Sequence, residues 1–274
     1  MIRTGVFKIG NIGASPLLEF LFDERAEREN IIFRVFGTGS KMSGPHIDEA
    51  ISDLIDWKHD LTLFVSPNAS LAAPRKIVDR LNETGVPLIV ISDSPAIKGI
   101  EELKQKEVGY IIITADPMIG ARREFLDPTE MAVFNADIIK VLAGAGVLKS
   151  IQKIIDKVIC DLQHGRAVLP FVIIDSNFIM ENPPYNNSYS NVKALAAFKL
   201  AELVGKIDIE ACFKVQEWKQ YTTLTAVAHE LLSRAAKLVE DARETDKCGD
   251  TLLREPHDAE GKLLKKLKLL EKPE

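Results

Sequence analysis

Short polar segments follow several apolar runs of this sequence. They carry hydroxyl, amide and carboxylate groups, which can hold a polar ring by hydrogen bonds or favour a developing positive charge. They also contain glycine and proline, which suit tight turns near a ligand. The candidate binding residues in these segments are Gly10, Asn11, Gly13, Ser15, Ser66, Pro67, Asn68, Ser92, Asp93, Ser94, Pro95, Asp116 and Pro117. Asp93 and Asp116 are the candidates for an electrostatic role. In the alternative interpretation, serine, aspartate and proline only form turns.

Two adjacent arginines, Arg122 and Arg123, are the strongest candidates for binding an anion. A guanidinium group binds a carboxylate or phosphate through two parallel hydrogen bonds. At least one of the two is expected to face solvent or to pair with Glu124 or Asp127.

The elements that must position these residues are strands alternating with helices. Apolar runs at residues 6–9, 31–36, 61–65, 87–91 and 110–114 are separated by helical patterns. Near-continuous apolar strands between helices predict a parallel sheet that is buried on both faces. The carboxyl ends of such strands meet at one edge, where ligands bind in a crevice. We therefore expect the polar segments to converge there.

The second half of the chain is predicted to be mainly helical. Asp127, Pro128 and Glu130 form a helix start, with an N-cap, a first-turn proline and a capping-box acid. Further helices are predicted at residues 147–160, 191–204 and 224–242, with short strands at 168–174 and 211–218 and a solvated helix at 262–272. The predicted fold is α/β, with a Rossmann-like, mainly parallel sheet domain at residues 1–126. A helical bundle with a small C-terminal strand and helix region follows at residues 127–274.

Composition excludes several classes of protein. The 35 basic and 40 acidic residues give a formal charge of −5, which argues against a duplex-binding surface. The three cysteines are far apart and indicate neither a disulfide framework nor a metal site, so a reducing cytoplasm fits best. The histidines have no metal-ligand spacing. Nothing in the sequence predicts a membrane span or a targeting segment.

Known nucleotide and hydrolase motifs are missing or incomplete. The first glycine turn has the spacing G-x-x-G-x-S, so it lacks the second glycine of the dinucleotide fingerprint. The strand at 31–36 runs into Gly37-Thr38-Gly39-Ser40-Lys41 without the acid that binds the NAD ribose. No nucleophile elbow or P-loop occurs. A crevice without a nucleophile or metal suits hydride transfer between two bound molecules, because positioning supplies much of the rate.

Several longer stretches resemble one enzyme family over the full length of the chain. They are Lys8–Ser15, Leu21–Glu29, Gly120–Ala132, Asn135–Asp137, Ala228–Glu230 and Arg254–His257. These stretches resemble the archaeal coenzyme F420-dependent methylenetetrahydromethanopterin dehydrogenases. The block at 120–137 is the most specific of them.

The resemblance implies an α/β domain with a helical bundle, a homohexamer built as a trimer of dimers, and no metal. It also implies reversible hydride transfer from the methylene carbon of methylenetetrahydromethanopterin to C5 of the deazaflavin coenzyme F420. Asp93 and Asp116 would favour the methenyl cation or hold the pterin. The anionic tails of the two ligands would meet Lys8, Lys41, Arg122 or Arg123.

The chain departs from the family pattern in one loop. Val65-Ser66 stands where a glycine pair is usual, and Leu71-Ala72-Ala73-Pro74 stands where a Pro-Gly-Pro turn is usual. Two alternatives therefore remain. One is an NADP-dependent dehydrogenase of a one-carbon carrier, with Ser40 and Lys41 receiving the extra phosphate. The other is a non-catalytic homologue that binds the deazaflavin or pterin.

Overall fold

The structure is a computed structural model that describes residues 1–23, 28–117, 125 and 127–274. The chain forms two compact units, and each unit is built from several separate segments of the sequence. The α/β unit comprises residues 1–113, 150–173 and 257–262, and the helical unit comprises 114–149, 174–256 and 263–274. The predicted division was a single cut after residue 126, whereas these units interleave along the sequence.

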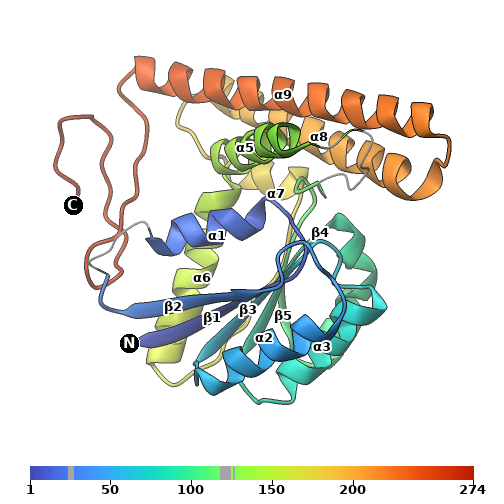
Figure 1. The fold of residues 1–274 in the computed structure, drawn as a ribbon. Coiled ribbons are helices and arrows are strands. Elements are labelled where there is room, and N and C mark those ends of the chain that lie inside the picture. Colours follow the sequence, from blue (N-terminus) through green and yellow to red (C-terminus); the bar gives the residue numbers. More distant parts are fainter. Residues whose placement is uncertain (24–27, 118–124, 126) are drawn as a thin grey trace. The chain divides into compact units, whose positions relative to one another are not determined.

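A parallel sheet forms the centre of the α/β unit (Figure 1). Its strands are β1 (Ile2–Lys8), β2 (Ile31–Gly37), β3 (Leu61–Ser66), β4 (Leu88–Asp93), β5 (Gly109–Ile113) and β6 (Phe171–Ile174). The spatial order is β2-β1-β3-β4-β5-β6, and the pairs from β2 through β5 are parallel. Tyr110 N donates to Pro170 O, and Thr114 N donates to Ile174 O. From the first bond to the second, the residue number rises by four on both strands. Strand β6 therefore runs parallel to β5 as well.

This strand order confirms the predicted α/β class with a parallel sheet and refines its topology. In the dinucleotide-binding order, 3-2-1-4-5-6, the chain reverses direction across the sheet between β1 and β4. Here β1 lies between β2 and β3, so the reversal falls between β1 and β3. The topology is that of the second common doubly wound sheet, which binds its ligands at the β1/β3 switch point.

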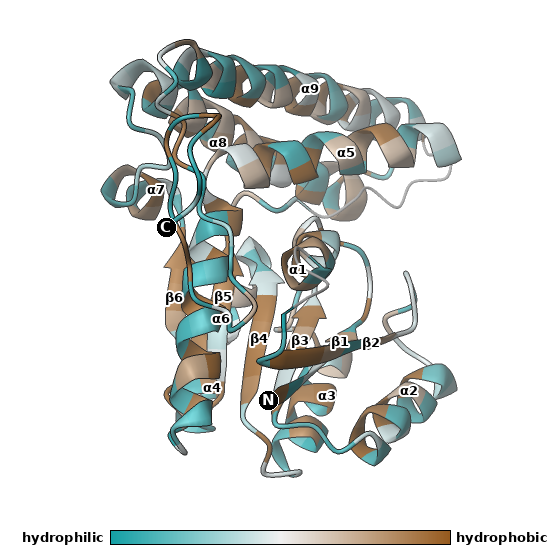
Figure 2. Ribbon diagram, turned by 90° about the vertical axis from the view of Figure 1, so that its left-hand side faces the viewer, coloured by the Kyte–Doolittle hydropathy of each residue, from teal (hydrophilic) through white to brown (hydrophobic). Residues whose placement is uncertain are grey.

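Helices cover both faces of the sheet. The helices of this layered arrangement are α1 (Ala14–Asp23), α2 (Pro45–Asp56), α3 (Ala72–Asn82), α4 (Ile100–Gln105) and α6 (Val147–Gln163). Helices α1 and α6 lie over one face, and α2 and α3 over the other (Figure 1). Figure 2 shows the apolar strands, whereas the helices are apolar on one side and polar on the other. This difference is expected when both sheet faces are covered.

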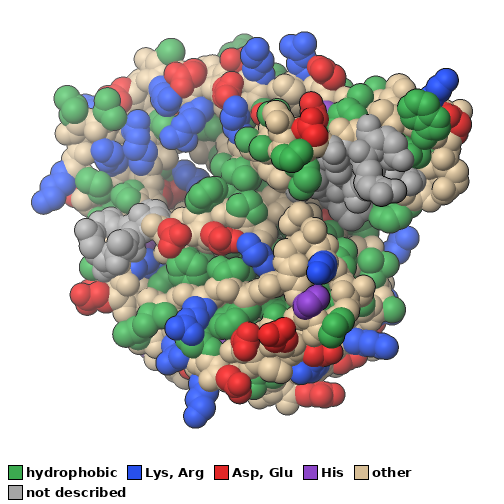
Figure 3. Space-filling model, viewed as in Figure 1, with side chains coloured by type: hydrophobic (Ala, Val, Ile, Leu, Met, Phe, Trp, Pro, Cys, Tyr) green, Lys and Arg blue, Asp and Glu red, His purple; other side chains and the backbone are tan. Residues whose placement is uncertain are grey.

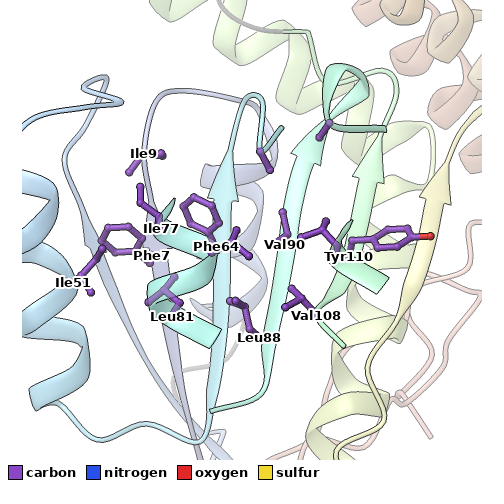
Figure 4. Close-up of a cluster of buried hydrophobic side chains, with 14 of the residues drawn as sticks. Phe7, Ile9, Ile51, Phe64, Ile77, Leu81, Leu88, Val90, Val108 and Tyr110 are labelled. Carbon is purple, nitrogen blue, oxygen red and sulfur yellow. The ribbon is translucent and has the colours of Figure 1, made fainter. Parts of the chain in front are cut away.

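One large core cluster joins the sheet to α2, α3 and α4 (Figure 4). Alternate strand residues supply the sheet side of this cluster, because successive side chains point to opposite faces. They include Phe7, Ile9, Phe64, Leu88, Val90, Tyr110 and Ile112, and the helices add Ile51, Ile77, Leu81 and Leu103. The intervening residues, such as Leu63 and Ile111, are fully buried on the other face.

The helical unit contains three long helices that pack on one another. Its elements are α5 (Pro128–Gly144), α7 (Ser176–Glu181), α8 (Ser188–Ile209), the π-helical turn η2 (Glu210–Lys214) and α9 (Trp218–Cys248). Helix α8 packs along α9, and α5 packs on both. The contact is close: a Cβ atom on Gly144 of α5 would lie 2.7 Å from Cβ of Val239. The start of α5 is as predicted, because the Asp127 carboxylate accepts the Glu130 N–H.

Two sequence predictions in this region are wrong. Residues 211–218 do not form a strand, because η2 extends α8 to Lys214 before the chain turns into α9. Residues 262–272 do not form a helix; they lie in an irregular segment with an isolated bridge between Arg254 and Lys266. The leucine and lysine residues of this segment favour a helix by propensity, and the tertiary context overrides that preference.

No single helix within the described residues is both long and apolar enough to cross a membrane. Helices α5 and α6 meet those criteria only when counted together as a bent pair.

A charged cluster is buried in the α/β unit. Arg28 Nη2 donates to Asp156 Oδ1 at 3.0 Å, and His257 Nε2 lies 2.6 Å from Asp156 Oδ2. The side chains of Arg28 and His257 are 3% and 0% exposed. The cluster binds the C-terminal segment 257–262 to α6 and to the chain that follows α1.

Another acid, Asp208, is buried in the helical unit near the end of α8. The residue is 1% exposed, and within the described chain neither of its carboxyl oxygens has a hydrogen-bond partner. Burial raises the pKa of Asp208 to about 8. The carboxyl group is therefore mostly protonated at neutral pH.

Replacing Asp156 with Ala should lower the free energy of unfolding by about 3–5 kcal/mol, because it leaves the buried Arg28 guanidinium without the carboxylate that balances its charge, although the bond to Asn30 remains. Urea denaturation measures this loss. Asp161→Ala on the same helix is the matched control, since its partner Arg166 is 67% exposed. Such an exposed pair contributes about 1 kcal/mol at most. Equal losses for the two variants would contradict the prediction.

The stability of Asp208→Asn relative to the wild type should increase as the pH rises from about 4 to 8. In this window the folded state keeps a proton that the unfolded chain releases, so raising the pH destabilises the native protein. The advantage of the variant should grow by up to about 1.4 kcal/mol per pH unit. Thermal unfolding at several pH values measures it, with the exposed Asp241→Asn as control. A pH-independent difference would refute the assignment.

Candidate functional site

The carboxyl ends of the strands form one edge of the sheet, as predicted. Lys8 of β1 pairs with Val65 of β3, Ser66 with Ser92 of β4, and Asp93 with Ile113 of β5. The loops that follow these strands therefore leave the sheet at one level. Because the chain reverses direction between β1 and β3, the loops after those two strands diverge to opposite faces. This divergence makes the edge above β1 and β3 the candidate ligand site.

The glycine turn after β1 holds neighbouring loops together. Gly10 has φ +69°, a conformation that other residues rarely adopt. A Cβ atom here would lie 2.8 Å from the Pro67 ring and 3.2 Å from Met42 Cγ. Gly10 thus allows the loops after β2 and β3 to approach the first turn. The sequence indicated the glycine and Pro67, whereas nothing in it indicated Met42.

The other candidates near this turn differ in exposure. Asn11 is partly exposed, whereas Gly13 is buried where the turn enters α1. Ser15 lies in the first turn of α1 and is 6% exposed, on the helix face shared by the buried Leu18 and Phe22. Its side chain therefore lies beneath α1, against the sheet. Within the described residues its hydroxyl has no hydrogen-bond partner.

Hydrogen bonds within the loops after β3 and β4 use two of the candidate side chains. Ser92 Oγ donates to Ser66 O at 2.6 Å and accepts from Ala69 N at 3.1 Å. Asn68 Oδ1 accepts from both the backbone N–H and the hydroxyl of Ser70, at 3.1 and 2.6 Å. Ser92 and Asn68 therefore act as turn formers in this structure. The alternative interpretation proposed this role for the serine but not for the asparagine. The bond from the Ser70 N–H to the Asn68 side chain is an Asx turn. The spacing of two residues between Asn68 and Ser70 was the sequence signal that could have predicted it.

Ser66 and Asp93 remain the polar groups of greatest chemical interest at the edge. Ser66 is fully buried, and within the described residues its hydroxyl has no hydrogen-bond partner. Asp93 is 1% exposed and caps the short 3-10 helix Ser94–Gly99 by accepting the Ser94 N–H at 2.5 Å. Pro95 follows in the first turn of this helix, so proline and aspartate together fix its start. A buried carboxylate at the edge favours a nearby positive charge, because the low dielectric strengthens the attraction.

The two candidate lysines have different surroundings. Lys8 Nζ forms an ion pair with Glu19 at 2.5 Å, so a ligand anion would compete with an existing partner. Lys41 lines a hollow at the end of β2 with Thr38, His46, Glu49 and Asp53, and Ser40 precedes it in the same loop. Acidic side chains gather over α2, beside this hollow (Figure 3). Their charge opposes binding of the extra phosphate of NADP.

Asp116 and Pro117 follow β5 and belong to the helical unit. Asp116 is 0% exposed. Pro117 lies close to Gly205 of α8. A Cβ atom added to Gly205 would be 3.7 Å from Cβ of Pro117. The predicted anion clamps Arg122 and Arg123 lie outside the described residues.

The described residues contain no group of three or more histidine, cysteine or acidic side chains suited to a metal ion. The cysteines within them form no disulfide, and Cys160 and Cys248 are exposed. The donor set at the sheet edge is instead hydroxyl, amide, carboxyl and backbone groups. Such donors suit polar heterocycles.

Comparisons with known proteins agree over the full length of the chain. The family model for methylene-5,6,7,8-tetrahydromethanopterin dehydrogenase matches residues 2–274. Proteins named F420-dependent methylenetetrahydromethanopterin dehydrogenase are 47% identical in Methanothermobacter marburgensis and 44% identical in Methanocaldococcus jannaschii, each aligned over 100% of both chains.

A solved structure is similar over 100% of both chains, with a TM-score of 0.97 and 38% identity. It is described as F420-dependent methylene-tetrahydromethanopterin dehydrogenase in complex with methylene-tetrahydromethanopterin and coenzyme F420. The family model, the full-length relatives and this structure agree, and the chain belongs to the methylenetetrahydromethanopterin dehydrogenase family.

Proposed function

We infer that this chain catalyses reversible hydride transfer between methylenetetrahydromethanopterin and coenzyme F420, giving the methenyl compound and reduced coenzyme F420. The observation that carries this function is the full-length structural match to a dehydrogenase in complex with both compounds. The agreement extends to sequence, with relatives of the same name at 41–47% identity.

The polar groups at the sheet edge fit heterocyclic ligands. Both rings carry amide-like edges, which need donors and acceptors at fixed positions. The Ser66 hydroxyl has no hydrogen-bond partner within the described residues, but it is fully buried, so the partly exposed Asn11 is proposed to meet the rings. Gly39 and Gly44 border open space, since an added Cβ atom on either would meet nothing within 4 Å. The loop after β2 therefore leaves room beside the sheet edge.

The residues of this chain act by binding and electrostatics. Coenzyme F420, when bound, supplies the hydride-accepting carbon. The carbon that loses hydride becomes part of a cation shared by two pterin nitrogens, so no strong acid or base is needed there. The buried Asp93 carboxylate favours that developing charge. Asp116 is proposed to do the same from the segment after β5.

Basic residues are proposed to bind the anionic tails of the ligands. Lys41 borders the hollow beside α2, whereas Lys8 would have to exchange its Glu19 partner. Arg122 and Arg123 keep this role as sequence-based proposals. Backbone groups of the turns at Gly10–Gly13 and Pro67 would complete the binding surface.

A homohexamer in the cytoplasm is proposed for the assembly and its location. The resemblance to the family supports the hexamer, and three cysteines that form no disulfide in the described chain suit a reducing compartment. Exposed apolar residues of the helical unit, such as Phe213, Trp218 and Leu270, provide surface that self-association would bury.

An absorbance assay tests the proposed reaction. Purified protein mixed with methylenetetrahydromethanopterin and oxidised coenzyme F420 should cause loss of the oxidised deazaflavin absorbance, and omission of either compound should abolish the loss. Replacing coenzyme F420 with NADP should give no reduction. Reduction of NADP alone would instead establish the nicotinamide alternative, and binding of the deazaflavin without turnover would establish the non-catalytic one.

Replacing Asp93 with Asn should lower kcat by roughly 100-fold while leaving the melting temperature nearly unchanged. The amide oxygen still accepts the Ser94 N–H, so the variant removes charge and keeps the helix cap. Asp258→Asn is the matched control, because Asp258 likewise accepts backbone N–H groups, from Glu260 and Lys262, in an exposed turn. Wild-type turnover of the Asp93 variant would restrict this residue to turn formation.

A further inference from the structure

A single carboxylate from α8 joins two other segments of the helical unit, one directly after β5 and one after β6. Thr114 Oγ1, directly after β5, donates to Glu202 Oε1 at 2.6 Å. Ser176 Oγ, at the start of α7 after β6, donates to Glu202 Oε2 at 2.5 Å. Each carboxylate oxygen thus binds one hydroxyl group from a different segment. Hydrogen bonds to an ionised acceptor of this kind are about twice as strong as neutral ones.

The segment held in this way is the short turn Thr114–Pro117, which contains Asp116. Thr114 N donates to Ile174 O at 3.1 Å, which fixes the beginning of the turn. At its other end, Pro117 lies against Gly205, one helical turn after Glu202. Asp116 stands between these two contacts and is 0% exposed. One turn of α8 therefore supports both ends of the Asp116 segment.

Helix α8 does not need Glu202 to keep its place. It packs along α9 through buried residues on its other faces, including Ala197, Ala201 and Val204. Glu202 itself is only partly buried. The bonds to Thr114 and Ser176 are thus not needed to hold α8 in place. Instead they fix the segments that follow β5 and β6.

We propose that Glu202 is a positioning residue for hydride transfer, which fixes the Thr114–Pro117 turn and thereby the Asp116 carboxylate. The inference rests on the proposed function, because it assumes that Asp116 favours the developing cation. Electrostatic stabilisation requires a charge that is already in place when the reaction occurs. A displaced Asp116 would therefore slow the chemical step more than it weakens binding of either substrate.

The decisive comparison is between Glu202→Ala and Glu202→Gln in the full-length protein. The alanine variant should lower kcat about tenfold or more, leave KM for both substrates within about twofold, and change the melting temperature little. The glutamine variant should recover most of the lost kcat, because its amide can bond to both hydroxyl groups. Glu181→Ala, which removes an exposed acid from α7, is the matched control and should behave like the wild type.

Two single-hydroxyl variants separate positioning of the Asp116 turn from general stability. Thr114→Val keeps the side-chain shape and removes the bond between Glu202 and the Asp116 turn, together with the 3.2 Å contact of Thr114 Oγ1 with Ile174 O, so it should reproduce most of the kcat loss. Ser176→Ala removes the other bond of the same carboxylate and should keep kcat within about twofold. Equal effects of the two variants, or unchanged kcat in a folded Glu202→Ala protein, would overturn the proposal.

A crystal structure of Glu202→Ala provides a readout that does not depend on activity. The Asp116 carboxylate should be displaced relative to its position in the wild-type crystal, and an unmoved carboxylate would overturn the proposal. An inactive wild-type protein would refute the proposed function alone, whereas the position of Asp116 would still test the role of Glu202.

Discussion

Burial of both faces of the parallel sheet is the constraint on which the rest of the structure depends. The strands β3, β4 and β5 are buried along their whole length, so their polar backbone groups must be paired within the sheet. Parallel pairing places every carboxyl end on the same edge, and each connection must cross a face as a helix. The polar loops are therefore confined to the rims of the sheet, where one rim collects the candidate ligand-binding groups.

The switch point between β1 and β3 makes that rim the candidate ligand site. Its geometry depends on close backbone approach, which Gly10 permits by leaving space for Pro67 and Met42. Beside it, Ser92 and Asn68 stiffen the loops after β3 and β4 through bonds within those loops. Hydride transfer gains from rigid placement of two rings. Loops whose polar groups bond to one another suit that requirement, and Asp93 adds a buried carboxylate at the same rim.

The helical unit contains polar groups that packing alone does not explain. Asp208 is a buried acid without a described partner, and it makes the native state less stable as the pH rises. Glu202, on the same helix, satisfies two hydroxyl groups from the segments after β5 and β6. Helix α8 therefore packs closely against α9 and also binds, through Glu202, the segments that follow β5 and β6.

Much of the fold could be predicted from the sequence. Apolar runs four to six residues long, separated by helical patterns, predicted the parallel sheet, because such strands must be buried on both faces. The cap formed by Asp127 and Glu130 is a local interaction, so the start of α5 was also predictable. The region after Ile209 was not, since helix and strand propensities were similar there and the packing of α8 on α9 favoured the π-helical extension.

The sequence by itself determined which chemical groups follow the strands, and its longer stretches identified the family. Only the tertiary structure decided what each group does. Ser92, Asn68 and Asp93 have similar polar, turn-forming positions in the sequence. In the structure Ser92 and Asn68 bond to the loop after β3, whereas Asp93 is a buried acid that caps the helix after β4. Met42 and Glu202 carried no signal, because their partners are distant in sequence. Such contacts arise only when the strand order and the helix packing bring those segments together.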